Sequence, residues 1–135
     1  MPKITSMPTE CYNITKWTIR DYDRRVKQLE QMRRDVESLK AASIDGMPKG
    51  EAAPGLDDKI AAMVDLENEV EKIQSCIDTI PPDMRDGIMN NIIKGNDYPR
   101  NAYGNYVPSK RTWKRAKKKF MILVAKELHI YGHYQ

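Results

Sequence analysis

The stretch SKRTWKRAKKKFMILVAKE, residues 109–127, decides how this chain folds. It contains no proline or glycine, and its apolar residues recur at the three- and four-residue intervals of an α-helix. At about 100° per residue, an apolar stripe forms along one side of that helix: Trp113, Ala116, Phe120, Leu123 and Val124. A stripe of this kind must pack on other elements, so we expect the helix to be anchored in a core.

The same helix carries a concentration of positive charge. Seven basic residues fall within its first half: Lys110, Arg111, Lys114, Arg115, Lys117, Lys118 and Lys119. The whole chain has a net charge of +4, whereas residues 109–135 hold eight Lys or Arg and a single acid. Cations that project from a helix anchored by its other side suit phosphate contact. We therefore expect nucleic-acid binding, and a solvated face without a partner is the alternative interpretation.

The preceding sequence predicts an all-α fold built on two long amphipathic helices. Apolar residues recur at intervals of three and four within residues 15–43 and again within 57–79, and a loop with glycines and prolines covers residues 44–56. We expect residues 15–80 to form a long antiparallel helical hairpin, coiled-coil-like, with Thr15 as the first N-cap. Residues 1–14, with Pro2 and Pro8, are expected to form an irregular N-terminal arm.

Residues 81–135 are expected to form a smaller helical region. Pro82 favours the start of one helix and Gly95 its end, and Ser109 is a natural N-cap for the basic helix. The turn-rich residues 96–108 between them hold three tyrosines that could stack on bases: Tyr98, Tyr103 and Tyr106. Tyrosines in a loop more often pack their rings on the domain and use the hydroxyl for hydrogen bonds.

Other classes of function find little support in the sequence. We see no phosphate-cradling glycine loop and no nucleophile beside a base, so we expect no catalytic residues and no cofactor. His129 and His133 lie one helical turn apart but have no third ligand nearby, so no metal site is expected. The longest apolar run has six residues and no secretory signal is visible, so we expect a cytoplasmic protein that does not enter membranes.

The order of these elements resembles that of small phage and prophage regulators of Gram-positive bacteria. These proteins have an N-terminal helical hairpin, a Gly/Pro loop and a C-terminal helix-turn-helix similar to region four of sigma factors. The resemblance covers about 110 residues and rests on the hairpin Tyr22–Leu39, the loop Gly46-Met47-Pro48-Lys49-Gly50, Asp65-Leu66-Glu67-Asn68-Glu69, Ile80-Pro81-Pro82 and Ser109-Lys110-Arg111-Thr112-Trp113-Lys114-Arg115.

The resemblance implies a transcription regulator that binds double-stranded DNA in a bacterial host cell. Because each apolar stripe of the hairpin is narrow and interrupted by charge, either the C-terminal helices or a second copy of the chain must cover it, and we expect a dimer through the hairpin. The resemblance also implies that one set of residues faces the major groove: Ser109, Lys110, Arg111, Thr112, Lys114 and Arg115. Whether residues 96–108 form the first helix of a true helix-turn-helix is left open. The competing interpretation is a phage-encoded inhibitor of a host or defence protein, such as an anti-CRISPR-type inhibitor, whose hairpin supplies contact area.

Overall fold

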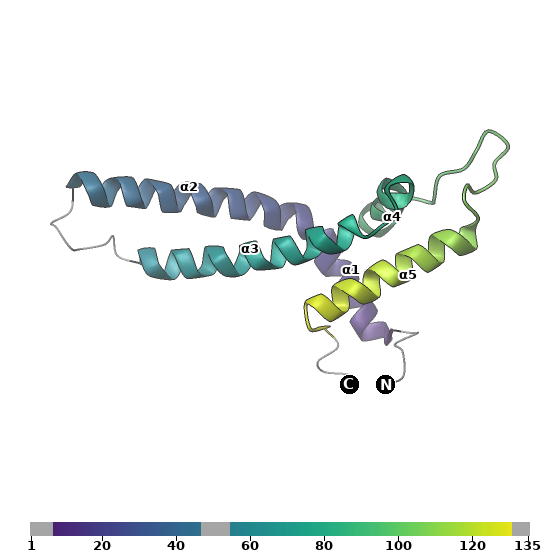
Figure 1. Ribbon diagram of the computed structural model, residues 1–135, viewed down its shortest axis with the longest axis horizontal. Helices are drawn as coiled ribbons and strands as arrows, with labels where there is room; N and C mark the ends of the chain where they lie inside the picture. The colour runs from purple at the N-terminus through teal and green to yellow at the C-terminus, as the bar shows by residue number, and fades with distance from the viewer. Residues whose placement is uncertain (1–6, 47–54, 131–135) are drawn as a thin grey trace. The chain divides into compact units, whose positions relative to one another are not determined.

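A computed structural model describes residues 7–46 and 55–130, and this part of the chain is built mainly of α-helices (Figure 1). The helices are α1 (Thr9–Arg20), α2 (Tyr22–Gly46), α3 (Leu56–Asp78), α4 (Pro82–Lys94) and α5 (Lys110–Glu127). The described residues form no β-strand, and their one β-bridge joins Arg100 to Tyr106. The predicted all-α fold is therefore confirmed.

The chain divides into two compact units. One unit combines Met1–Asp21 with Lys72–Gln135, and the other is Tyr22–Glu71. The first unit contains α1, the last turns of α3, α4 and α5, and the second contains α2 and the rest of α3. This division differs from the expected boundaries at residues 14 and 80, because both ends of the chain contribute to one core.

Within the Tyr22–Glu71 unit, α2 and α3 contact each other through ion pairs and a small apolar cluster. Arg25 pairs with Glu69 at 2.8 Å and Arg33 with Glu67 at 2.9 Å. The cluster is centred on two buried residues and completed by three half-buried ones: Val36, Leu56, Leu39, Ile60 and Met63. Early residues of α2 face late residues of α3, so the two helices run in opposite directions.

The loop expected at residues 44–56 has fewer residues than predicted. Helix α2 continues to Gly46 and α3 begins at Leu56, which shortens the loop at both ends. Residues 47–54, with most of the Gly/Pro segment, lie outside the described residues.

The expectation of an irregular arm over residues 1–14 is wrong from Thr9 onward, where α1 begins. Cys11, Thr15 and Ile19 follow at four-residue intervals and are all buried. Thr15 is therefore inside a helix instead of capping one, and its hydroxyl donates to the Cys11 carbonyl at 2.7 Å. This local bond satisfies the buried hydroxyl. The expected single helix from residue 15 to 43 is also interrupted, since Asp21 ends α1. Residues 1–6 lie outside the described part.

The corner between α3 and α4 is held by Arg85. Its guanidinium donates to the carbonyl oxygens of Ile77, Asp78 and Ile80 at 3.1–3.2 Å. These carbonyls lie at the end of α3 and just after it, where no following helical turn supplies backbone N–H donors. Pro82 occupies the first turn of α4, as expected, and Arg85 lies one turn further along.

The end of α4 is also as predicted. Gly95 follows the helix with φ +73°, and its N–H donates to Asn91 while that of Asn96 donates to Asn90. This is the left-handed helix ending that glycine favours. Arg20 of α1 adds a hydrogen bond to the Ile92 carbonyl at 2.7 Å, which ties α1 to the same end of α4.

None of the helices in the described ranges is both long and apolar enough to cross a lipid bilayer.

Candidate nucleic-acid interface

Helix α5 begins with the cap that the sequence predicts. The Ser109 hydroxyl oxygen accepts a hydrogen bond from the Thr112 backbone N–H at 3.3 Å, and the two hydroxyl oxygens lie 3.0 Å apart. This cap satisfies one of the backbone donors that a helix start leaves open. Both hydroxyls therefore stabilise the helix start, and Ser109 and Thr112 remain exposed beside the first cations.

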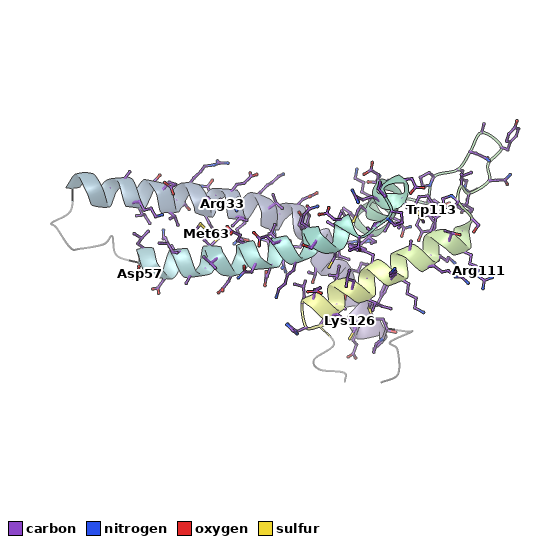
Figure 2. All side chains as sticks on the ribbon, viewed as in Figure 1. Arg33, Asp57, Met63, Arg111, Trp113 and Lys126 are labelled. Carbon is purple, nitrogen blue, oxygen red and sulfur yellow. The ribbon has the colours of Figure 1, made fainter. Side chains whose placement is uncertain are left out.

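The apolar side of α5 is anchored as the sequence predicts. Three residues of the predicted stripe are buried, and the other two, Ala116 and Leu123, are half-buried. The buried three are Trp113, Phe120 and Val124. The absence of a side chain at Gly87 of α4 permits close packing, since a Cβ there would lie 2.8 Å from Cη2 of the Trp113 ring. Arg111 projects from the opposite side of α5 to Trp113 (Figure 2). The core thus fixes which side of the helix is presented outward.

The first turns of α5 also carry the basic face, which we define by seven residues: Lys110, Arg111, Lys114, Arg115, Lys117, Lys118 and Lys119. Six of these residues are exposed, and Lys117 is half-buried. Within residues 7–46 and 55–130, none of the seven forms an ion pair with an acidic side chain. Their charge is therefore not neutralised by the described acids of the protein itself.

A shallow, open hollow of about 490 Å³ lies on the basic face. Its lining consists of five cations, and we call it the basic hollow: Lys110, Arg111, Lys114, Arg115 and Lys118. An anion placed in this hollow would be attracted by all five cations at once. The geometry therefore suits a group such as phosphate.

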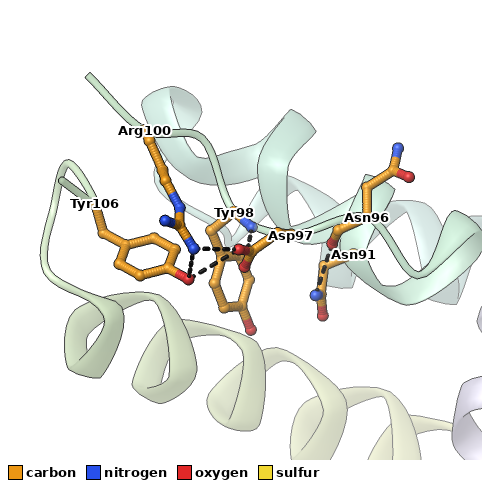
Figure 3. A network of polar contacts seen from close by, with 6 residues as sticks. All are labelled: Asn91, Asn96, Asp97, Tyr98, Arg100 and Tyr106. Atoms are coloured by element: carbon orange, nitrogen blue, oxygen red, sulfur yellow. Dashed lines mark hydrogen bonds and ion pairs between the residues drawn. The ribbon is translucent and has the colours of Figure 1, made fainter. Parts of the chain in front are cut away.

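The loop between α4 and α5 contains a polar network around Asp97 (Figure 3). The Asp97 carboxylate accepts hydrogen bonds from Arg100 and from the Tyr106 hydroxyl, each at 2.8 Å. Arg100 first, and Tyr106 second, lower the pKa of Asp97 from 3.8 to about 2. The same contact with Asp97 raises the pKa of Arg100. The network holds together the two sides of the loop that lead into α5.

The three tyrosines proposed for base stacking have different environments. Tyr98 is 6% exposed and one face of its ring is covered by Trp113, with ring centroids 5.1 Å apart, which leaves little of the ring for the predicted base stacking. Tyr106 is half-buried, and the cationic groups of Arg100 and Lys110 lie 4.3 and 5.2 Å from its ring centroid. Tyr103 is 88% exposed at the tip of the loop. Of the three, Tyr103 alone presents an open ring.

Residues 96–108 form no helix. Helices α4 and α5 are separated by residues 95–109, whereas a helix-turn-helix joins its two helices by about 3–4 residues. The arrangement therefore differs from that of a standard helix-turn-helix. Instead of a preceding helix, the basic helix follows a loop closed by the bridge between Arg100 and Tyr106.

Two parts of this region were not predicted from the sequence. Tyr12 of α1 lies beside the basic face, with the Lys117 ammonium 5.8 Å from its ring centroid. The four-residue spacing of Cys11, Thr15 and Ile19 could have indicated the helix that brings Tyr12 there. The Asp97 network was also missed, because no local pattern shows that Arg100 and Tyr106 converge on one carboxylate.

The described residues contain no group of three side chains able to hold a metal ion, and His133 lies outside them. Comparisons of the chain with models of protein families, with curated proteins and with solved structures found no match.

Proposed function

We propose that this protein binds double-stranded DNA through the basic face of α5 and acts as a phage-type transcription regulator. The observation that carries the proposal is the set of seven cations on the first turns of one helix, without an ion pair to the described acids. An alternative use of this charge would be solubility. A solubility role does not require cations clustered around one hollow, since dispersed charge serves it equally well.

Binding would begin with phosphates. Each lysine or arginine that meets a phosphate releases a condensed counterion, which makes affinity strongly dependent on salt. The α5 N-terminus adds backbone N–H groups and the positive end of the helix dipole near Lys110 and Arg111. These contributions would position the protein on DNA without reading its sequence.

Base reading would depend on Arg111 and Arg115. Both are exposed, one helical turn apart, and both line the basic hollow. An arginine can donate two hydrogen bonds to the major-groove edge of guanine, which gives a preference of about 1–3 kcal/mol over another base. Specific promoter recognition in this protein would therefore rest on these two side chains, with the lysines contributing mainly to phosphate affinity.

A direct test compares wild type with Arg111→Ala/Arg115→Ala on a promoter-containing fragment, by fluorescence anisotropy at low salt. The matched control is Lys59→Ala/Lys72→Ala, which removes two exposed cations from α3. It therefore has the same net charge as the Arg111→Ala/Arg115→Ala variant. We expect the α5 variant to bind more weakly and the control to bind as wild type does. Equal binding by all three proteins would reject the assignment.

The salt dependence provides an independent readout. If four cations of the basic face meet phosphates, log affinity should fall with log salt at a slope of about −3.6. Removing two of the contacts should reduce the slope to about −1.8. A slope unchanged by the double substitution would show that other residues contact the phosphates.

A second candidate function is inhibition of a host or defence protein. It is favoured by the outer side of α1, where Trp17 is 62% exposed and Ile14 is 46% exposed. Tryptophan is enriched among residues that dominate protein interfaces. If this function holds, Trp17→Ala should abolish capture of a partner from nuclease-treated host lysate while leaving DNA binding intact. Loss of every partner after nuclease treatment counts against it.

A further inference from the structure

We infer that the protein has a subsite for one unpaired base, located beside the basic hollow and reached by a single-stranded segment of DNA. The subsite is a second hollow, here called the apolar hollow, between α1 and α5. Its lining consists of Met7, Tyr12, Tyr98, Met121 and the lysines 114, 117 and 118. This inference rests on the proposed function and adds to it a preference for one form of DNA.

The size and lining of the apolar hollow fit a flat aromatic group attached to an anion. Its volume is about 400 Å³, within the range of pockets that hold small organic ligands. Tyr12 and the two methionines provide an apolar surface, whereas the three lysines provide charge. A nucleotide combines the two matching features, since its base stacks on aromatic rings and its phosphate attracts ammonium groups.

The position of the hollow points to DNA in preference to a free nucleotide. Lys114 and Lys118 line both the apolar hollow and the basic hollow. These lysines lie one turn apart on α5, a rise of about 6 Å along the helix. A strand whose phosphates follow the basic hollow would therefore pass directly by the apolar one. One continuous chain of phosphates can occupy both.

The base must be unpaired to enter. In a duplex, each base has both faces covered by its neighbours and its edge paired, so entry requires unstacking and extrusion, which costs free energy. A single-stranded extension has no such cost. We therefore expect tighter binding to DNA with an extension than to a blunt duplex of the same sequence.

The ring of Tyr12 is the group that we expect to contact the base. Tyr12 is half-buried, and the Lys117 ammonium lies 5.8 Å from its ring centroid. Tyr98 lines the same hollow, but one face of its ring is already occupied by Trp113. The Tyr12→Leu variant keeps an apolar side chain suited to a helix and removes the ring.

The experiment measures the affinity of wild type for three probes: a blunt duplex, the same duplex with a short thymine extension, and the same duplex with an abasic extension. The two extensions carry equal charge and differ only in the bases. We expect wild type to bind the thymine extension about tenfold more tightly than the abasic one. Tyr12→Leu should remove this difference and leave blunt-duplex affinity unchanged, with circular dichroism confirming the fold.

A matched control is Tyr103→Leu, which removes an aromatic ring from the exposed loop tip. This variant should keep the difference in affinity between the two extensions. If Tyr103→Leu loses that difference and Tyr12→Leu keeps it, the assignment of the subsite is overturned. Equal affinity of wild type for the thymine and abasic extensions, with blunt duplex still bound, would overturn the subsite alone. Failure to bind any of the three probes would overturn the proposed DNA binding as well.

Discussion

The ring of Tyr98 lies parallel to the ring of Trp113, with centroids 5.1 Å apart and an angle of 7° between the planes. Tyr98 belongs to the loop after α4, and Trp113 to the first turns of α5. Stacked aromatic pairs contribute about 0.5–1.5 kcal/mol beyond the area that they bury. The stack therefore joins the loop to the helix that carries the basic face, and it fixes the side from which the cations project.

Enlarging Gly87 should destabilise this arrangement. In Gly87→Ala, the new Cβ would lie 2.8 Å from Cη2 of Trp113 and 2.9 Å from Cδ of Pro99, so these groups must move. Overpacking of this kind costs about 1–3 kcal/mol of unfolding free energy, which urea denaturation can measure. Trp113→Phe lacks the two ring atoms nearest the new Cβ. The cost of Gly87→Ala should therefore be smaller in that background, and equal costs in both would contradict the steric explanation.

Replacing Arg85 should loosen the corner between α3 and α4. Arg85→Met keeps much of the apolar stem but leaves the carbonyls of Ile77, Asp78 and Ile80 without their guanidinium donor. Hydrogen bonds from charged groups contribute about 1.5–3 kcal/mol each when buried, and less at this partly exposed site. We expect the free energy of unfolding, measured by thermal denaturation, to fall by about 1–3 kcal/mol. The exposed Arg34→Met serves as control and should change stability by under about 0.5 kcal/mol.

The loop network should respond to acid. Because the pKa of Asp97 is lowered from 3.8 to about 2, the folded loop favours the carboxylate. The ionised Asp97 carboxylate therefore stabilises the folded protein fully above about pH 3.8, and this stabilisation is lost as the pH falls toward 2. Carboxyl carbon chemical shifts can follow this titration by NMR. Tyr106→Phe should raise the pKa of Asp97, and Arg100→Met should raise it further, because the arginine has the larger effect.

Both cysteine thiols should be unreactive in the folded protein. Cys11 and Cys76 are buried, and burial raises the pKa of both thiols, that of Cys76 to about 11 with a smaller effect of Glu127. At pH 7 the reactive thiolate of Cys76 is then roughly one part in ten thousand. A colorimetric thiol assay should detect both cysteines after unfolding and neither at early times before it. Immediate reaction of the Cys76 thiol in native Cys11→Ala would contradict this prediction.

Dimerisation through residues 15–80 stays a prediction. Light scattering coupled to size exclusion should give twice the 15.6 kDa mass of the chain if it is correct. In the Tyr22–Glu71 unit, Val64 of α3 is 45% exposed and would be covered by a second copy. Val64→Asp should then shift the mass toward that of a monomer without changing helix content. A monomeric wild type would remove the hairpin from consideration as an interface.

Local sequence patterns were sufficient to predict several features of α5 and its surroundings. Trp113, Phe120 and Val124 are buried at their predicted helical spacing, because periodicity depends on backbone geometry alone. Ser109 and Gly95 were likewise identified by the local chemistry of helix ends. These features need no knowledge of distant parts of the chain.

Features that depend on distant contacts were not predictable in this way. Thr15 was predicted as an N-cap because threonine is common at that position. In the structure, its hydroxyl forms a hydrogen bond within α1 and the residue is buried. The burial of Tyr98 depends on Trp113, which lies on another element. The contact of Tyr12 with Lys117 likewise requires that α1 lie near α5, which no short stretch of sequence indicates.

The segment Tyr22–Glu71 is an insertion within the unit formed by both ends of the chain. Residues on either side of it, Ile19 and Ile73, are fully buried in that unit, so the points where the chain leaves and returns are each fixed. The inserted helices can therefore lengthen or shorten by whole turns without altering the sequence on either side. Changes of length confined to the inserted segment would therefore leave the basic helix and the core that anchors it unchanged.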